Sequence, residues 1–235
     1  MCFSASASFA SGAVLSSIGV LSIKKVAHRS DLFFASIPLF FGLQQFVEGI
    51  LWLTLTNKID VTWQQTPAHI FIFFAQVVWP VLVPYAFLKL ESDSSYIKLQ
   101  QTFTIIGTLV SCYLAYCLFS FHVEGTITGY HIAYIQNYPV SISKFGGSLY
   151  VIATIFPPFF SSIKGMKLLG IGIVISYLVS HLLFSDYLVS VWCFFASFIS
   201  IYIYHIISSM NTRFIPNTSL NPNSALEKAE SIKHL

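Results

Sequence analysis

Residues Leu32 to Leu55 read LFFASIPLFFGLQQFVEGILWLTL, and this stretch decides the fold of the chain. A helix that crosses a membrane needs about 20 consecutive, predominantly apolar residues. The stretch meets that requirement with a single charged side chain, Glu48. It therefore predicts a membrane-crossing helix.

The rest of the chain shares this apolar character. Hydrophobic residues make up 55% of the 235 residues and charged residues only 9%, and the mean hydropathy is +0.74. Such a composition cannot form an ordinary water-facing surface. The sequence therefore predicts an integral membrane protein whose main partner is the lipid bilayer. We read no nucleic-acid site from the modest net charge of +3.

Clusters of charged residues divide the sequence into seven apolar stretches, each close to the length of a membrane-crossing helix. The predicted spans are residues 4–23, 32–55, 69–88, 101–121, 145–163, 168–184 and 187–207. They predict an all-α fold, a seven-transmembrane helix bundle over residues 1–207, followed by a mobile cytoplasmic tail over 208–235. Pro80 and Pro84 are expected to break the third span, and Pro157-Pro158 to kink or end the fifth.

Small residues recur every four positions along the first span, at Ser4, Ser8, Gly12 and Ser16. Such a ridge lets the backbone of a neighbouring helix approach closely. We expect it to serve helix packing.

The orientation of the bundle follows from the positions of Lys and Arg, which accumulate in cytoplasmic loops. If the N-terminus lies outside, the outer segments hold only Lys58 and Lys144. The inner segments then hold Lys24, Lys25, Arg29, Lys89, Lys98, Lys164, Lys167, Arg213, Lys228 and Lys233. This bias predicts a multi-pass protein of the cell inner membrane with its N-terminus outside and its C-terminus in the cytoplasm.

One connection, from His122 to Lys144, is longer than compact folds normally leave without a purpose. Residues 126–134 alternate enough to permit a short strand or hairpin. The segment is expected to be either a lid or an interfacial loop whose tyrosines lie at the level of the lipid headgroups.

Glu48 is the strongest candidate for a functional residue, because a charge at the centre of a membrane helix costs roughly 2.5 to 3.5 kcal/mol on insertion scales. No Lys or Arg falls within any predicted span, so no buried protein cation can neutralise it. The carboxyl is then protonated and donates a hydrogen bond, or a hydrated pocket, a cationic ligand or a metal offsets its charge. The structural alternative is a protonated Glu48 that joins two helices by a hydrogen bond to Gln76 or to a backbone carbonyl, worth about 1 kcal/mol.

Several other polar and aromatic side chains share the predicted outer half of the membrane with Glu48. The rise of 1.5 Å per helical residue places Glu48 and Gln76 at the same level, with His181 nearby. The predicted ligand-binding residues are Gln44, Gln45, Glu48, Trp52, Gln76, Tyr113, Tyr177, His181 and Trp192.

Histidines and carboxylates collect on the same outer side, where they could supply zinc or another divalent metal with nitrogen and oxygen ligands. The candidate metal ligands are Glu48, His69, His131, His181 and Asp186. No HExxH or HxxxH pattern occurs in the sequence, and its four cysteines lack paired spacing, so a structural zinc site is not expected. Cys2 could bind a soft metal, accept an acyl chain or act as a nucleophile if Met1 is removed.

The chain also carries a set of longer motifs. They are the opening Met1-Cys2-Phe3-Ser4-Ala5, the segment Gln44-Gln45-x-x-Glu48-Gly49-x-x-Trp52, the Trp79-Pro80 pair, His131-Ile132-x-Tyr134 and Ser190-Val191-Trp192-Cys193-Phe194-Phe195-Ala196. Together they resemble an uncharacterised family of bacterial integral membrane proteins, a domain of unknown function. The likeness extends to about Ile207 and implies a bacterial multi-pass membrane protein.

The number of spans and their orientation are also similar to those of the seven-helix membrane hydrolases of the alkaline ceramidase and adiponectin-receptor group. That resemblance implies zinc held by histidines, with Ser and Asp taking part in hydrolysis. The HxxxH pair of the group is missing from the last span, where His205 stands alone on the inner side.

These observations lead to three functional hypotheses. The first is a multi-pass protein with an outward-facing polar pocket around Glu48 that binds a small molecule or cation, for sensing or transport. The second is a metal-dependent membrane hydrolase acting on a lipid or amide, with Glu48, His131, His181 and Asp186 as candidate catalytic residues. The third is a structural membrane subunit in which Glu48 only holds helices together.

Overall fold

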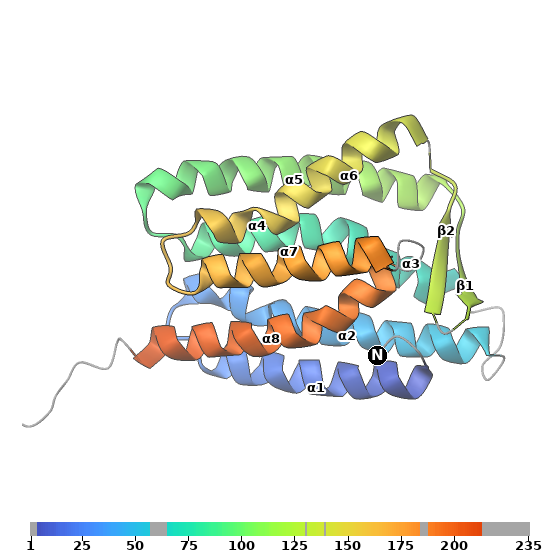
Figure 1. The fold of residues 1–235 in the computed structure, drawn as a ribbon, viewed down its shortest axis with the longest axis horizontal. Helices are drawn as coiled ribbons and strands as arrows, with labels where there is room; N and C mark the ends of the chain where they lie inside the picture. Colours follow the sequence, from blue (N-terminus) through green and yellow to red (C-terminus); the bar gives the residue numbers. More distant parts are fainter. Residues whose placement is uncertain (1–3, 57–64, 130, 139, 184–187, 213–235) are drawn as a thin grey trace, which may run out of the picture.

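The computed structural model describes residues 4–56, 65–129, 131–138, 140–183 and 188–212. Apart from one β-hairpin, these residues form helices that lie side by side along one direction (Figure 1). The helices are α1 (Ala5–Lys24), α2 (Leu32–Leu55), α3 (Gln65–Phe73), α4 (Trp79–Leu90), α5 (Ser94–Ser120), α6 (Val140–Ile155), α7 (Met166–Leu183) and α8 (Leu188–Thr212). A π-helical turn (Phe74–Val78) joins α3 to α4, and short 3-10 helices precede α2 (Arg29–Asp31) and follow α6 (Pro157–Phe160).

The predicted all-α character is confirmed, and each predicted span overlaps a helix or the continuous α3–α4 segment, although α6 already ends at Ile155. Five segments are long and apolar enough to cross a membrane: Ala5–Lys24, Arg29–Leu55, Gln65–Leu90, Ser94–Ser120 and Met166–Leu183. Within α6 and α8 the described apolar segments are shorter, Gly146–Ile155 and Phe195–Met210. Helix α8 runs to Thr212, beyond the predicted end of the last span at residue 207, and the remaining predicted tail, 213–235, lies outside the described residues.

Helices α1 and α2 pack closely through small residues. A side chain at Gly12 would come within 3.1 Å of the carbonyl oxygen of Gly42, and one at Gly42 would come within 2.7 Å of the backbone nitrogen of Ser16. The ridge on the first span therefore serves helix packing, as the sequence predicts.

The third span does not break at its prolines, contrary to the expectation from the sequence. Instead, the helix widens into the π-helical turn just before Pro80, and α4 then continues through Pro84. A π-helical turn leaves backbone carbonyls to be satisfied from outside the helix. The hydroxyl of Tyr150 donates to the carbonyl of Ala75 at 2.7 Å, and that of Ser111 to the carbonyl of Val77 at 2.7 Å.

The Pro157-Pro158 pair ends the fifth span, as predicted, because α6 stops at Ile155 and a 3-10 helix begins at Pro157. Proline has no N–H, so carbonyls in and near this turn need other donors. The buried amide of Gln100 on α5 supplies them, donating to the carbonyls of Pro157 at 2.9 Å and Phe160 at 2.7 Å.

The long connection contains an antiparallel hairpin, which confirms the strand pattern expected there. Strands β1 (Val123–Thr128) and β2 (His131–Gln136) lie across the helix ends at the side of the bundle where α1 begins (Figure 1). We call this side the hairpin end and the opposite side the far end. The Tyr134 ring stacks on Phe71 of α3, with centroids 4.8 Å apart, and Ile132 is fully buried against Leu51, Trp52 and Ala68.

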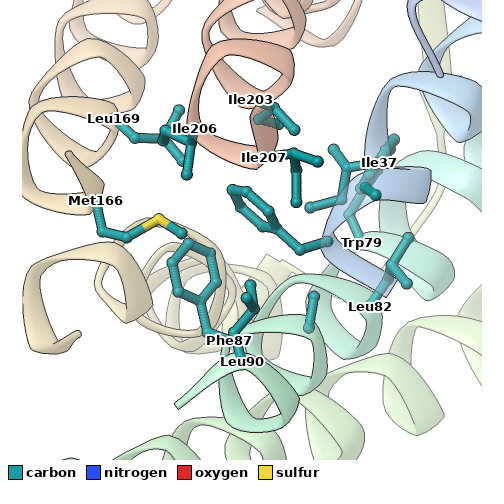
Figure 2. Packing of buried hydrophobic residues seen from close by; sticks show 13 residues of the cluster. Ile37, Trp79, Leu82, Phe87, Leu90, Met166, Leu169, Ile203, Ile206 and Ile207 are labelled. Carbon is teal, nitrogen blue, oxygen red and sulfur yellow. The ribbon is translucent and has the colours of Figure 1, made fainter. Parts of the chain in front are cut away.

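The main hydrophobic cluster lies toward the far end, where Leu90 ends α4 and Met166 begins α7. Figure 2 shows the labelled side chains converging from four helices: Ile37 of α2, Trp79, Leu82, Phe87 and Leu90 of α4, Met166 and Leu169 of α7, and Ile203, Ile206 and Ile207 of α8. This cluster packs the interior of the bundle toward the far end.

The connections at the far end meet at Glu91, which follows α4. Its carboxylate accepts backbone hydrogen bonds from Ser92 and Asp93, both at 3.0 Å, and from Ser162 at 2.9 Å, as well as one from the Ser162 hydroxyl. Glu91 thereby joins the α4–α5 connection to the segment that leads into α7.

Candidate functional site

A cavity of about 270 Å³ lies inside the bundle. Helices α2, α4, α5, α6, α7 and α8 contribute to its walls, together with the π-helical turn, the end of β2 and the segment that follows it. Phe87, Leu169 and Ile203 belong both to the cavity wall and to the main hydrophobic cluster. The cavity therefore extends from that cluster toward the hairpin end.

Most of the wall is aromatic or aliphatic. Trp79 stacks on Phe41 with ring centroids 4.0 Å apart, and Phe34 meets Phe87 edge to face at 5.5 Å. None of the described lining residues carries a charge. Such a site suits an uncharged group or one that binds to the faces of aromatic rings.

Gln44 places an amide in the cavity wall in a defined orientation. The indole N–H of Trp79 donates to Oε1 of Gln44 at 2.8 Å. Because an indole nitrogen can only donate, this bond identifies the side-chain oxygen and places the amide nitrogen at the other position. Gln44 is 1% exposed, and its Nε2 has no hydrogen-bond partner in the described part of the chain.

A second amide group lies where the hairpin leads back into the bundle. Gln76, in the π-helical turn, donates from Nε2 to Oε1 of Gln136 at 2.9 Å and accepts from the hydroxyl of Tyr138 at 3.3 Å. Burial raises the pKa of the Tyr138 hydroxyl, so it remains a protonated donor. These two bonds connect the hairpin to the α3–α4 rod and occupy the amide oxygens of both glutamines.

Tyr113 on α5 faces the same cavity. Among the described residues its buried hydroxyl makes no hydrogen bond of ordinary geometry, and the polar group that it does interact with, the thiol of Cys117, is a weak partner. A side chain at Gly146 of α6 would lie within 3.7 Å of the Tyr113 ring, whereas one at Gly147 would meet nothing within 4 Å. Gly146 therefore lies next to the Tyr113 ring, and Gly147 borders open space.

Glu48 is not among the residues that line the cavity. It is fully buried on α2, one helical turn from Gln44, and its Oε2 accepts a hydrogen bond from Nε2 of Gln45 at 3.1 Å. Gln44, Gln45, Glu48 and Trp52 are all buried. The wall of the cavity thus contains Gln44, and Glu48 lies one helical turn from Gln44 on α2.

The predicted ligand-binding residues separate into groups. Gln44, Gln76 and Tyr113 line the cavity. Trp52 packs beneath the hairpin, while the exposed His181 stacks its ring on Tyr177 on the surface of α7, with centroids 5.7 Å apart. The side chain of Trp192 lies outside the described part of the structure.

The candidate metal ligands do not come together where the structure describes them. No group of three His, Cys, Asp or Glu side chains forms among the described residues. His69 contacts the carbonyl of Gln65 at 2.8 Å through Nδ1, and burial lowers the pKa of His131, which starts β2. Asp186 and Cys2 lie outside the described residues.

Sequence reasoning missed four polar residues of the cavity: Gln136, Tyr138, Tyr150 and Thr154. Gln136 and Tyr138 follow the predicted strand segment directly, so a hairpin folded back over the helices could have indicated them. Tyr150 was visible as a hydroxyl in an otherwise apolar span, but nothing in the sequence showed that it faces the π-helical turn.

Comparison with known proteins gives one relationship. No curated protein and no solved structure matches the chain. A family model, described as a family of unknown function (DUF6629), matches residues 1–217 and so covers every described residue. The chain belongs to this family of unknown function.

Proposed function

We propose that this chain is a multi-pass protein of the cell inner membrane that binds a small molecule in the cavity beside Glu48, for sensing or for transport. Five long apolar helices and the distribution of Lys and Arg support the membrane assignment. In this proposal all seven predicted spans cross the membrane, with the N-terminus outside. The hairpin end, where α1 begins, is then the outer end, and the polar side of the cavity faces outward.

The observation that carries the binding proposal is a pair of buried polar groups in an apolar cavity. Gln44 Nε2 lines the cavity without a hydrogen-bond partner in the described chain, and the Tyr113 hydroxyl has beside it only the weakly accepting thiol of Cys117 among the described residues. A buried donor without a partner costs about 1–3 kcal/mol, so a fold that only needed packing would gain by replacing them with apolar side chains. A bound molecule that meets both groups accounts for their presence.

The orientation can be tested with reporters fused to the C-terminus. A fluorescent protein folds in the cytoplasm and should therefore give a signal when it is fused after Thr212. Alkaline phosphatase is active only outside and should give no signal at the same position. The reverse pattern would contradict the proposed orientation.

Ligand binding can be tested by thermal unfolding of the full chain in lipid nanodiscs against a library of uncharged and cationic small molecules. A ligand at 100 times its Kd should stabilise the folded protein by about 2.7 kcal/mol. Gly147 is an exposed glycine of the cavity wall where an added side chain would meet nothing within 4 Å, so Gly147→Leu should obstruct the opening and abolish that stabilisation, while its own stability should be kept.

The matched control is Gly172→Leu on α7, where a side chain also meets nothing within 4 Å but where the glycine is exposed and is not part of the cavity wall. This control should respond to ligands as the wild type does. The proposal fails if no compound stabilises the wild type, or if Gly147→Leu retains the full stabilisation.

A further inference from the structure

We infer that the cavity takes an uncharged molecule dissolved in the bilayer, and that Gln44 and Tyr113 hold an acceptor oxygen of that molecule, such as a ketone or quinone-type carbonyl. This inference rests on the proposed function, because it assigns a ligand class to the same cavity.

The hydrogen-bonding groups of the cavity favour an acceptor on the ligand. Nε2 of Gln44 can only donate, and the Tyr113 hydroxyl can donate as well. The amide oxygens in the wall are already occupied: that of Gln44 by Trp79, that of Gln76 by Tyr138 and that of Gln136 by Gln76. A ligand oxygen would complete both donors, whereas each amide oxygen of the wall already accepts one hydrogen bond and so needs no donor from the ligand.

The wall also favours a ligand without a charge. No described lining residue is charged, so a cation or an anion would lose its water without gaining an opposite charge in return. The stacked Phe41–Trp79 pair and the Phe34–Phe87 pair instead offer flat apolar surfaces, which suit an aliphatic or ring-shaped body.

The cavity opens at mid-height of α6. Gly147 is exposed and at the same time belongs to the cavity wall, so the cavity reaches the surface beside it. Gly147 lies about two helical turns inside α6 (Val140–Ile155), and neighbouring α7 presents Leu168, Ile171, Ile175 and Leu178 outward. An opening at that height on an apolar surface faces lipid chains, and a molecule dissolved in the bilayer can enter through it.

The test uses a photoreactive long-chain ketone, 2-undecanone carrying a diazirine, on the full chain in phosphatidylcholine nanodiscs. Labelling is located by peptide mass spectrometry, and unlabelled 2-undecanone, undecane and undecyltrimethylammonium are the competitors. We expect labels on cavity-lining residues, and competition by the ketone about tenfold better than by the alkane, the value of one hydrogen bond of ordinary strength.

The deciding variant is Tyr113→Phe, which removes only a hydroxyl whose polar neighbour among the described residues is the weakly accepting thiol of Cys117, so the variant should fold as well as the wild type. It should weaken competition by the ketone about tenfold and leave that by undecane unchanged. Tyr116→Phe, one turn along α5 and 65% exposed, is the matched control and should behave like the wild type. Gly147→Leu should abolish labelling inside the cavity, and Gly172→Leu should not.

Equal competition by ketone and alkane, or an unchanged Tyr113→Phe, would overturn the role of the acceptor oxygen. If undecyltrimethylammonium competes better than 2-undecanone, the ligand is not uncharged, but the proposed function is unaffected. Butanone is a short, water-soluble ketone. If it competes as well as 2-undecanone at equal total concentration, the ligand does not enter from the bilayer. If the ketone labels no cavity residue and no library compound stabilises the wild type, both this inference and the proposed function fail.

Discussion

A carboxylic acid side chain with no exposed surface is the most unusual residue of the chain. Glu48 lies on α2 and accepts a hydrogen bond from Gln45 three residues before it. An amide can donate to a carboxylate or to the carbonyl oxygen of a neutral acid, so this bond does not require a charge. What the structure requires at position 48 is an acceptor oxygen for the buried amide of Gln45.

Two substitutions separate the acceptor from the charge. Glu48→Gln retains a carbonyl oxygen at the same place and should change the free energy of unfolding by less than about 1 kcal/mol. Glu48→Leu leaves the Gln45 amide buried without this partner and should cost about 1–3 kcal/mol. Thermal unfolding in detergent measures both.

The same two substitutions at Glu124, whose side chain is 48% exposed on the hairpin, should leave stability nearly unchanged. A Glu48→Gln variant that unfolds as readily as Glu48→Leu would show that the negative charge itself is needed, which would favour a cation or a metal beside it.

At the scale of helices, the closest approach is between α4 and α5. Gly107 of α5 lies against the carbonyl oxygen of Pro80, so close that a side chain carbon there would overlap it. The carbonyl belongs to the first turn of α4, directly after the π-helical turn. The contact therefore positions the Gln76 and Trp79 side chains on one side of the cavity.

Gly107→Ala should force the two helices apart, because the atom in the way belongs to the backbone. We expect a loss of at least about 1–3 kcal/mol in the free energy of unfolding, together with weaker ligand stabilisation. Gly172→Ala is the control, since its added methyl group meets nothing within 4 Å and should be neutral or stabilising by up to about 1 kcal/mol. Equal stability of the two variants would contradict the close approach.

The helices were predictable from the sequence because their length and apolar character are local properties. The α2 segment was predicted with the bounds that the structure shows, and α6 was predicted to end or kink at Pro157-Pro158. The rotation of each helix about its own axis was not predictable, because most faces of these helices are apolar and carry no periodic signal. For this reason the sequence did not show that Tyr150 of α6 faces the π-helical turn or that His181 on α7 is exposed.

The π-helical turn could not be predicted for a different reason. Its carbonyls are satisfied by Ser111 of α5 and Tyr150 of α6, which are distant in sequence. A local pattern around Pro80 therefore indicated a break, whereas the tertiary hydrogen bonds keep the rod continuous. Three cavity residues, Gln44, Gln76 and Tyr113, were still found from their polarity within apolar spans.

At the scale of the whole molecule, the two ends of the bundle are closed in different ways. The hairpin end is covered by β1 and β2, which pack apolar side chains on the helices (Figure 1). The far end is held by a buried carboxylate, since Glu91 is 7% exposed and gathers four hydrogen bonds from two connections. The hairpin end is thus closed mainly by apolar packing, whereas the stability of the far end should depend on the ionisation of Glu91.

The pH dependence at the far end has a defined sign. Burial by itself would raise the pKa of Glu91, but the hydrogen bonds from Ser162, from the backbone of Asp93 and from Ser161 outweigh it and lower the pKa below its ordinary value near 4.5. A carboxyl whose pKa is lowered in the folded state stabilises the fold above its unfolded pKa, and this contribution is lost as the pH falls through the folded value. Stability at neutral pH therefore includes a contribution from ionised Glu91.

Glu91→Gln isolates this contribution, because the amide has the same shape as the carboxylate but replaces one acceptor oxygen with an NH2 donor. That donor either faces the backbone N–H of Ser162 or takes the place of the oxygen that accepts the other hydrogen bonds. At pH 7 the variant should be less stable than the wild type by about 1.5–3 kcal/mol, the usual value for hydrogen bonds to a charged group. The difference in Tm between the two proteins should shrink as the pH is lowered from 5 through the folded pKa, because only the wild type has a carboxylate to protonate. Glu124→Gln, at an exposed position of the hairpin, is the control, and its Tm should equal that of the wild type at every pH. If the Tm difference between the wild type and Glu91→Gln stays constant down to pH 3, the charge of Glu91 does not hold the far end together.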